Sequence, residues 1–224
     1  MLEVLVHGAR VWLLPQRAAF LPDEATLLVA DAHLGKAVSF RRLGLPVPEA
    51  TTDETLQRLA QAVAATGARQ VVFLGDLLHS ARSRAEATMA AVARWRERHA
   101  SLALTLVRGN HDGHAGDPPA DWGVSCVDGP LLLDPGGLAL AHHPQSVPGR
   151  YVVAGHLHPA AVVGGRGHDR LRLPCFHFGA TVGVLPAFGA FTGMHVMPRA
   201  PGDRVFVVAG DAVRPLPGLH TLAA

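Results

Sequence analysis

The chain contains 224 residues, of which 49% are hydrophobic, and its formal net charge is +2 with neutral histidines. This length and apolar share suffice to bury a substantial core, and we expect a single domain spanning residues 1–224. The small net charge excludes attraction of a polyanion by overall charge, so any such contact has to be local.

The first half of the sequence alternates predicted strands and helices. Two apolar runs in residues 2–14 predict a hairpin, and the apolar run 26–30 predicts a strand buried on both faces. The pattern then predicts a short basic helix over 34–43, a helix from Thr51 to Gly67, a strand over 71–74, a helix over 84–99 and a strand over 102–107. Such alternation is typical of a parallel sheet with ligand residues at the carboxyl ends of its strands.

The second half has a different character. After Gly113 the proline and glycine content rises and helical periodicity fades. Short strands are predicted over 131–133, 138–142, 151–154, 171–178 and 205–209, which indicates a second, mixed or antiparallel sheet.

Two features of the sequence indicate the cellular compartment. Cys126 and Cys175 stand in apolar stretches without a CxxC pattern, which favours two buried reduced thiols. No run of about 18 apolar residues and no basic-then-apolar leader occurs, so we expect no membrane association and a cytoplasmic protein.

Five short clusters follow apolar runs and together predict a two-metal centre. They are Asp31-Ala32-His33, Gly75-Asp76, Gly109-Asn110-His111-Asp112, His142 and Gly155-His156-Leu157-His158. In extended backbone, residues two apart share a face, so Asp31 with His33 and His156 with His158 are each expected to reach one cation. Asp76 is placed to bridge two cations, and a donor set of imidazoles, carboxylates and one amide favours Mn, Fe or Zn over Mg or Ca.

The same clusters predict a reaction. Two cations about 3.5 to 4 Å apart grip a phosphate and lower the pKa of a bridging water, which supplies hydroxide for in-line attack. In extended backbone His111 projects away from Asn110 toward substrate, as a general acid for the leaving group. Asp112 is the candidate to orient His111.

These residues resemble the calcineurin-like metallophosphoesterase superfamily, whose pattern is DxH, GD, GNH followed by D or E, H, and GHxH. All five elements occur between residues 31 and 158. The stretches 30–37, 39–42, 75–80 and 185–193 are most similar to the ligase-associated DNA damage response endonuclease family. His79, where phosphatase members carry an aspartate, favours a phosphodiester over a phosphomonoester substrate.

The resemblance implies specific roles and an architecture. It assigns Asp31, His33, Asp76 and His158 to one metal, and Asp76, Asn110, His142 and His156 to the other, with His111 as the acid. It also implies Mn-dependent phosphodiesterase or endonuclease chemistry in DNA repair, beside a DNA ligase, a helicase and an exonuclease. The implied fold is a four-layer α-β-β-α sandwich of two mixed sheets.

Several alternatives remain open at this stage. His142 is favoured over its neighbour His143 as the ligand, and His79 is expected to pack rather than to bind metal. Lys36, Arg41 and Arg42 are candidates for substrate contact, against the alternative of an ordinary solvated helix face. A phosphatase or nucleotide phosphodiesterase acting on small molecules, and a catalytically silent interaction module, compete with the nuclease.

Overall fold

The first sheet combines an antiparallel start with a parallel end. The computed structural model describes residues 1–41, 44, 47, 51–134, 137–164 and 170–217. In sheet order, its seven strands are β1 (Leu2–Val6), β2 (Ala9–Leu13), β3 (Ala19–Leu21), β4 (Thr26–Ala30), β5 (Gln70–Leu74), β6 (Ala103–Val107) and β7 (Val124–Val127). Strands β1 to β4 pair antiparallel and β4 to β7 pair parallel, so the predicted hairpin and parallel unit are both confirmed.

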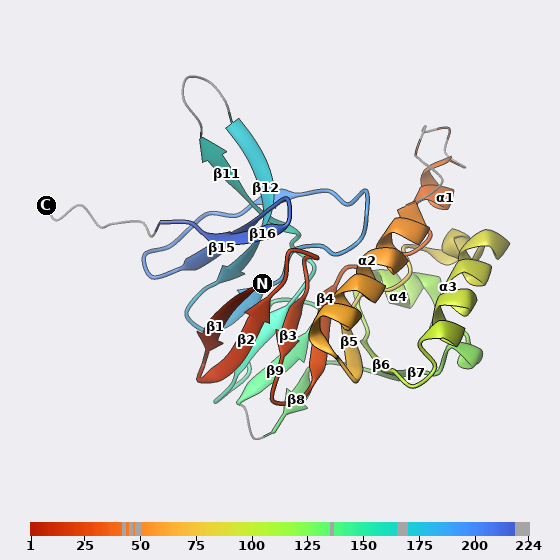
Figure 1. Ribbon diagram of the computed structural model, residues 1–224, viewed down its shortest axis with the longest axis horizontal. Helices are drawn as coiled ribbons and strands as arrows, with labels where there is room; N and C mark the ends of the chain where they lie inside the picture. Colours follow the sequence, from red (N-terminus) through yellow and green to blue (C-terminus); the bar gives the residue numbers. More distant parts are fainter. Residues whose placement is uncertain (42–43, 45–46, 48–50, 135–136, 165–169, 218–224) are drawn as a thin grey trace, which may run out of the picture.

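Helices cover one face of this sheet (Figure 1). They are α1 (Lys36–Arg41), α2 (Thr51–Thr66), η1 (Ala81–Arg84), α3 (Glu86–Arg98), α4 (Asn110–Ala115) and η2 (Ala120–Trp122). Leu56 and Leu59 of α2 and Trp95 of α3 belong to one buried cluster with Phe73 of β5 and Leu106 of β6. The apolar spacing along α2 therefore marks the face that it turns to the sheet.

The second sheet is mixed, as expected. Its strands are β8 (Leu131–Leu133), β9 (Leu138–Ala141), β10 (Tyr151–Ala154), β11 (Pro159–Gly164), β12 (Arg170–Phe178), β13 (Val182–Val184), β14 (His195–Val196), β15 (Arg204–Ala209) and β16 (Ala212–Pro215). Strand β10 pairs parallel with β9 and β13, whereas β12 pairs antiparallel with β11, β13 and β15. Five of these strands were predicted, and the short β13, β14 and β16 and the longer β11 were not.

The two sheets pack face to face through a second buried cluster. Val72 and Leu74 of β5 meet Leu140 of β9 and Phe176 of β12 there, while Val71 and Phe73 belong to the helix side. Because side chains alternate along a strand, β5 is apolar on both faces, which explains its uninterrupted run of apolar residues.

The α/β class with two packed mixed sheets is confirmed, but the helices are distributed unevenly. Between residue 123 and residue 217 the described parts of the chain contain no helix, so the expected helical layer outside the second sheet is not found there. Val147, in the loop after β9, packs instead on Ala139, Val152 and Ala154 of that outer face. No helix within the described ranges is long and apolar enough to cross a membrane.

Sheet register brings the functional clusters together. Ala30, Leu74 and Val107 end three parallel strands in register, and Ala141 and Ala154 end two parallel strands of the second sheet. Each of the five predicted clusters begins within three residues of one of these ends. The clusters therefore collect at one edge where both sheets contribute loops.

Candidate metal centre

The loops that carry the metal-type residues are not extended. Asp31, His33, Asp76, His156 and His158 all have positive φ, between 45° and 70°. The expectation that the paired ligands share a face of extended strands is wrong, because β4 ends at Ala30 and β10 ends at Ala154. Left-handed backbone at non-glycine residues costs free energy and is typical of functional sites held by their surroundings.

The first donor group contains Asp31, His33 and His158. Their ligand atoms lie within 4.8 Å of one another, and the Nε2 atoms of His33 and His158 are 3.4 Å apart. His158 Nδ1 is 3.2 Å from the carbonyl oxygen of Gly193. A carbonyl can only accept, so Nδ1 carries the proton and Nε2 presents its lone pair to the group.

The second donor group contains Asn110, His142 and His156. His142 Nε2 is 2.8 Å from Asn110 Oδ1 and 3.1 Å from His156 Nδ1. His142 Nδ1–H donates to the carbonyl oxygen of Leu74 at 3.0 Å, which leaves Nε2 as an acceptor. A histidine whose other ring nitrogen donates to a backbone carbonyl is the usual arrangement of a metal ligand.

Asp76 lies between the two groups. Its Oδ2 is 3.8 Å from His33 Nε2 and its Oδ1 is 3.5 Å from His142 Nε2, so one oxygen faces each group. Asp31 Oδ2 accepts the His156 backbone N–H at 2.8 Å, which ties the loop after β4 to the loop after β10. The two sheets are thus joined directly at the centre.

The residues fit divalent cations. The lone pairs of His142 Nε2 and Asn110 Oδ1 face each other without a proton between them, an arrangement that a cation stabilises. Asp31 is fully buried, and its Oδ1 has no hydrogen-bond partner among the described residues. Donors bound at about 2.0–2.2 Å to one ion lie roughly 3–3.5 Å apart, close to the separations found here.

Burial sets the protonation of this centre. Desolvation lowers the pKa of His33, His142 and His156, which keeps their imidazoles neutral and able to bind metal. The pKa of Asp76 is raised, first by burial and further by the charge of Asp31. Cations would offset this burial penalty because they favour the charged carboxylate.

Two glycines permit the close approach of the loops. A Cβ on Gly75, whose φ is +77°, would lie 2.2 Å from His142 Nδ1, and a Cβ on Gly109 would lie 2.4 Å from Asp76 Oδ1. The predicted Gly75-Asp76 and Gly109-Asn110 pairs therefore serve packing as well as ligation.

Asp112 does not orient His111. Its buried carboxylate accepts three backbone N–H groups, from Asp76 at 2.7 Å, Leu77 at 3.0 Å and Gly109 at 2.8 Å. Asp112 therefore positions the segment that carries Asp76. A carboxylate one residue along a helix points away from its neighbour's ring, because α4, not extended chain, begins at Asn110.

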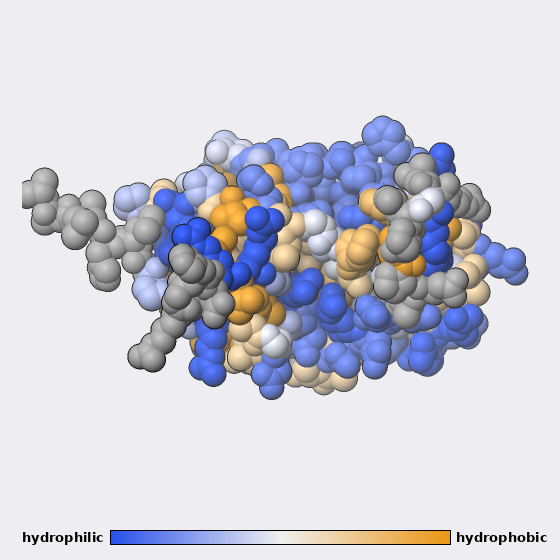
Figure 2. All heavy atoms as spheres, turned by 90° about the horizontal axis from the view of Figure 1, so that it is seen from above, coloured by the Kyte–Doolittle hydropathy of each residue, from blue (hydrophilic) through white to orange (hydrophobic). Residues whose placement is uncertain are grey.

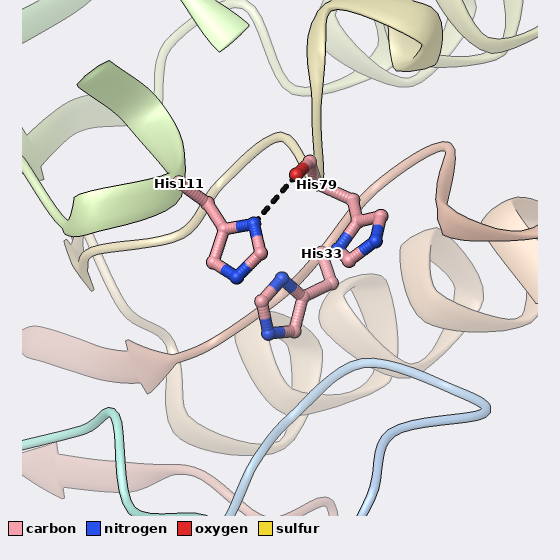
Figure 3. Close-up of side chains that lie close together, drawn as sticks. All are labelled: His33, His79 and His111. Atoms are coloured by element: carbon pink, nitrogen blue, oxygen red, sulfur yellow. Dashed lines mark hydrogen bonds between the residues drawn. The ribbon is translucent and has the colours of Figure 1, made fainter. Parts of the chain in front are cut away.

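His111 is oriented instead by His79 (Figure 3). His111 Nδ1–H donates to the His79 carbonyl oxygen at 2.7 Å, and the two rings stack with centroids 4.9 Å apart. His111 Nε2 lies 3.9 Å from Asp76 Oδ2, beside the centre. Burial lowers the pKa of His79 to about 4, so its ring is neutral at pH 7.

The remaining candidates occupy different positions. His142 is buried while His143 is exposed, although the His143 ring lies 4.2 Å from that of His156. Lys36 Nζ stands 5.6 Å from the Phe40 ring, and Arg41 donates to the carbonyl oxygen of Val47 at 3.3 Å. Arg42, the third predicted substrate contact, lies outside the described residues. Cys175 is buried as expected, but Cys126 is only half-buried.

A solved structure shows where this chain belongs. The crystal structure of Pseudomonas putida nuclease MPE matches it with a TM-score of 0.84 and 42% identity, over 96% of this chain and 99% of that one. The chain belongs to the calcineurin-like metallophosphoesterase superfamily. The resemblance read from the five clusters is thereby confirmed. No protein-family model and no curated protein matches the chain.

A second structural match is remote. The phosphoesterase YfcE from E. coli is 18% identical over 84% of this chain and 90% of that one, with a TM-score of 0.38. That likeness is too weak to support an argument. The assignment of this metallophosphoesterase therefore rests on the Pseudomonas nuclease together with the geometry of its own centre.

Sequence reasoning missed two contributions to this metallophosphoesterase site. The carbonyl oxygen of His79 leaves no trace in the sequence, because any residue carries one. The three-donor role of Asp112 depends on where Gly109 and Asp76 fold. The GNHD spacing was the available signal, since an acidic residue in the first turn of a helix often accepts backbone N–H groups.

Proposed function

We propose that this chain is a divalent-metal-dependent phosphodiesterase that cleaves DNA as an endonuclease. The observation that carries the proposal is the pair of donor groups that share Asp76, with His111 Nε2 beside them. The 42% identity to a Pseudomonas nuclease over nearly the whole chain supports a nucleic-acid substrate. Asn110 is exposed, so the second donor group can be reached by a substrate from solvent.

The chain's own residues would bind and protonate the substrate as follows. Asp31, His33 and His158 would hold one cation, Asn110, His142 and His156 would hold the other, and Asp76 would contribute one carboxylate oxygen to each. When bound, the cations supply charge against the phosphate oxygens and water of lowered pKa.

His111 completes the arrangement. Its Nδ1–H is held by the His79 carbonyl, so Nε2 is the atom that gains and releases the proton. Protonated there, His111 donates to the oxygen that leaves phosphorus.

We further propose Mn as the metal, with Fe or Zn as alternatives. The donors are imidazole nitrogens, carboxylates and one amide oxygen, without a thiolate, and this mixture is less suited to Mg or Ca. Lys36, Arg41 and Arg42 are proposed as contacts to the phosphate backbone, and Arg41 keeps N–H donors besides the one that it gives to the Val47 carbonyl oxygen.

The first experiment compares two small substrates. The Mn-loaded protein should hydrolyse an aryl phosphodiester in preference to the matching monoester and should nick plasmid DNA. His111→Ala should lower the rate by about 10²- to 10⁴-fold, the usual contribution of a general acid. His99→Ala, at the end of α3, is the matched control. A strong monoester preference would favour a small-molecule phosphatase. Full activity of His111→Ala would show that His111 is not the general acid.

The cellular setting follows from the resemblance. We propose a cytoplasmic role in DNA repair beside a DNA ligase, a helicase and an exonuclease, testable by affinity purification of the tagged chain from its own cells. We also propose that residues 1–224 act as one domain, because both sheets contribute ligands. A single cooperative unfolding transition is the expected observation.

A further inference from the structure

The loop between β13 and β14 is anchored to the metal centre at both ends. At its start, the N–H groups of Phe188 and Gly189 donate to the carbonyl oxygens of Ala30 and Asp31, at 2.8 and 3.1 Å. At its end, the carbonyl oxygen of Gly193 accepts from His158 Nδ1. Phe191 stands between these anchors. Its backbone is thus held beside the first donor group.

The exposure and the backbone conformation of Phe191 both cost free energy. Its side chain is 53% exposed, and its φ of 58° is a conformation that aromatic residues rarely adopt. Strain at an exposed bulky residue persists only when surrounding contacts impose it, and it is characteristic of ligand-binding segments. An exposed phenylalanine alone would need no explanation, but the strain beside the donor groups does.

Neighbouring aromatic rings connect Phe191 with His111, the proposed general acid. Phe191 and Phe40 form a T-shaped pair, with ring centroids 6.1 Å apart and an interplanar angle of 85°. The Phe40 ring is 5.8 Å from that of His79, which stacks on His111. Lys36 Nζ lies over the Phe40 ring, so a positively charged side chain stands beside these aromatic rings. Figure 2 shows hydrophobic patches on either side of a hydrophilic strip on the upper face of the molecule.

We propose that Phe191 and Phe40 form a stacking site for an unstacked nucleobase next to the phosphate that is cleaved. This inference rests on the proposed function, since the cations held by the donor groups would bind the phosphate. Every base has a flat π-face, so aromatic side chains bind bases without reading their sequence, while cations follow the backbone. Because Phe191 is 53% exposed, its ring is accessible to a base, and Lys36, next to Phe40, is placed for the adjoining phosphate.

The test separates bases from backbone. The Mn-loaded protein is given a single-stranded oligothymidylate and an oligomer of equal length and charge that consists of abasic tetrahydrofuran residues. We expect kcat/KM to be about tenfold higher for the oligothymidylate, a typical effect of stacking one base on an aromatic ring. The difference should lie mainly in KM. In Phe191→Ala the ratio should fall to about one.

Three further variants sharpen the result. Phe191→Trp should keep the tenfold ratio because it keeps a stacking surface, whereas Phe191→Leu should lose it although it stays apolar. Leu132→Ala removes another exposed apolar side chain, on β8, and should keep the wild-type ratio. An unchanged ratio in Phe191→Ala, or a wild-type ratio near one, would overturn the stacking site and leave the nuclease standing. Failure of the wild type to cleave either oligomer would instead overturn the proposed function, and this inference with it.

Discussion

Replacing Asp112 should destabilise the protein even without metal. Its carboxylate is buried and accepts three backbone N–H groups. Asp112→Ala leaves these three donors without an acceptor, at about 1–3 kcal/mol each. We expect a loss of about 3–9 kcal/mol in the free energy of unfolding, the lower end applying if water enters the space. For a chain of this length, each kcal/mol lowers Tm by roughly 2–4 °C.

Asp112→Asn gives a finer comparison. Asp112 Oδ2 accepts from Asp76 and Gly109, and Oδ1 accepts from Leu77. An amide oxygen at the Oδ2 position keeps two bonds, while its NH₂ opposes the Leu77 N–H. The expected loss is about 1.5–3 kcal/mol, the range of one hydrogen bond to a charged group.

The assay is urea unfolding of both variants in the presence of a chelator. Asp128→Ala is the control, because Asp128 is an exposed partner of Arg108 and such pairs contribute about 0–1 kcal/mol. Stability of Asp112→Ala within 1 kcal/mol of wild type would refute the reasoning. An effect of Asp112→Ala that appeared only in the pH dependence of the reaction rate would also refute it, because that result would indicate that Asp112 orients the His111 ring.

Three other outcomes follow from the same contacts. Gly75→Ala should abolish Mn binding measured by calorimetry, because its Cβ would overlap His142, while Gly67→Ala, also at positive φ but with open space around it, should lose only about 1 kcal/mol of stability. Burial raises the pKa of the Cys175 thiol from 9.0 to about 12, so its neutral form contributes stability that is present below pH 9 and lost as pH rises toward 12. Between pH 8 and pH 10, wild type should therefore lose up to about 1.4 kcal/mol more unfolding free energy than Cys175→Ala loses. An equal loss in the two proteins would contradict this expectation. Each of the two proposed sites, filled with Mn at about 100 times its Kd, should stabilise the native protein by about 2.7 kcal/mol, and Asp31→Asn should remove the share of the first donor group; an unchanged gain would show that the ion binds elsewhere.

The local sequence was sufficient to identify the side chains that could bind metal. Donor-type residues directly after the apolar runs marked the ends of β4, β5 and β6, because a buried strand has to be apolar and its first polar residue lies at the rim. Parallel pairing of neighbouring strands then implied that Asp31, Asp76 and Asn110 share one edge. These expectations needed only periodicity and connection rules.

The tertiary structure decided how those groups point. Positive φ at Asp31 and His33 follows from hydrogen bonds to residues far along the chain, such as the His33 N–H to the carbonyl oxygen of Asp76, so no local pattern predicts it. The orientation of His111 by a carbonyl oxygen, and the approach of Phe191 to Phe40, likewise depend on long-range packing.

Side-chain chemistry is a local property, so the residue types alone identify the atoms that can bind metal. Which lone pairs meet depends on folding, because the backbone hydrogen bonds and close contacts that orient them join segments more than a hundred residues apart, as Asp31 and His156 show.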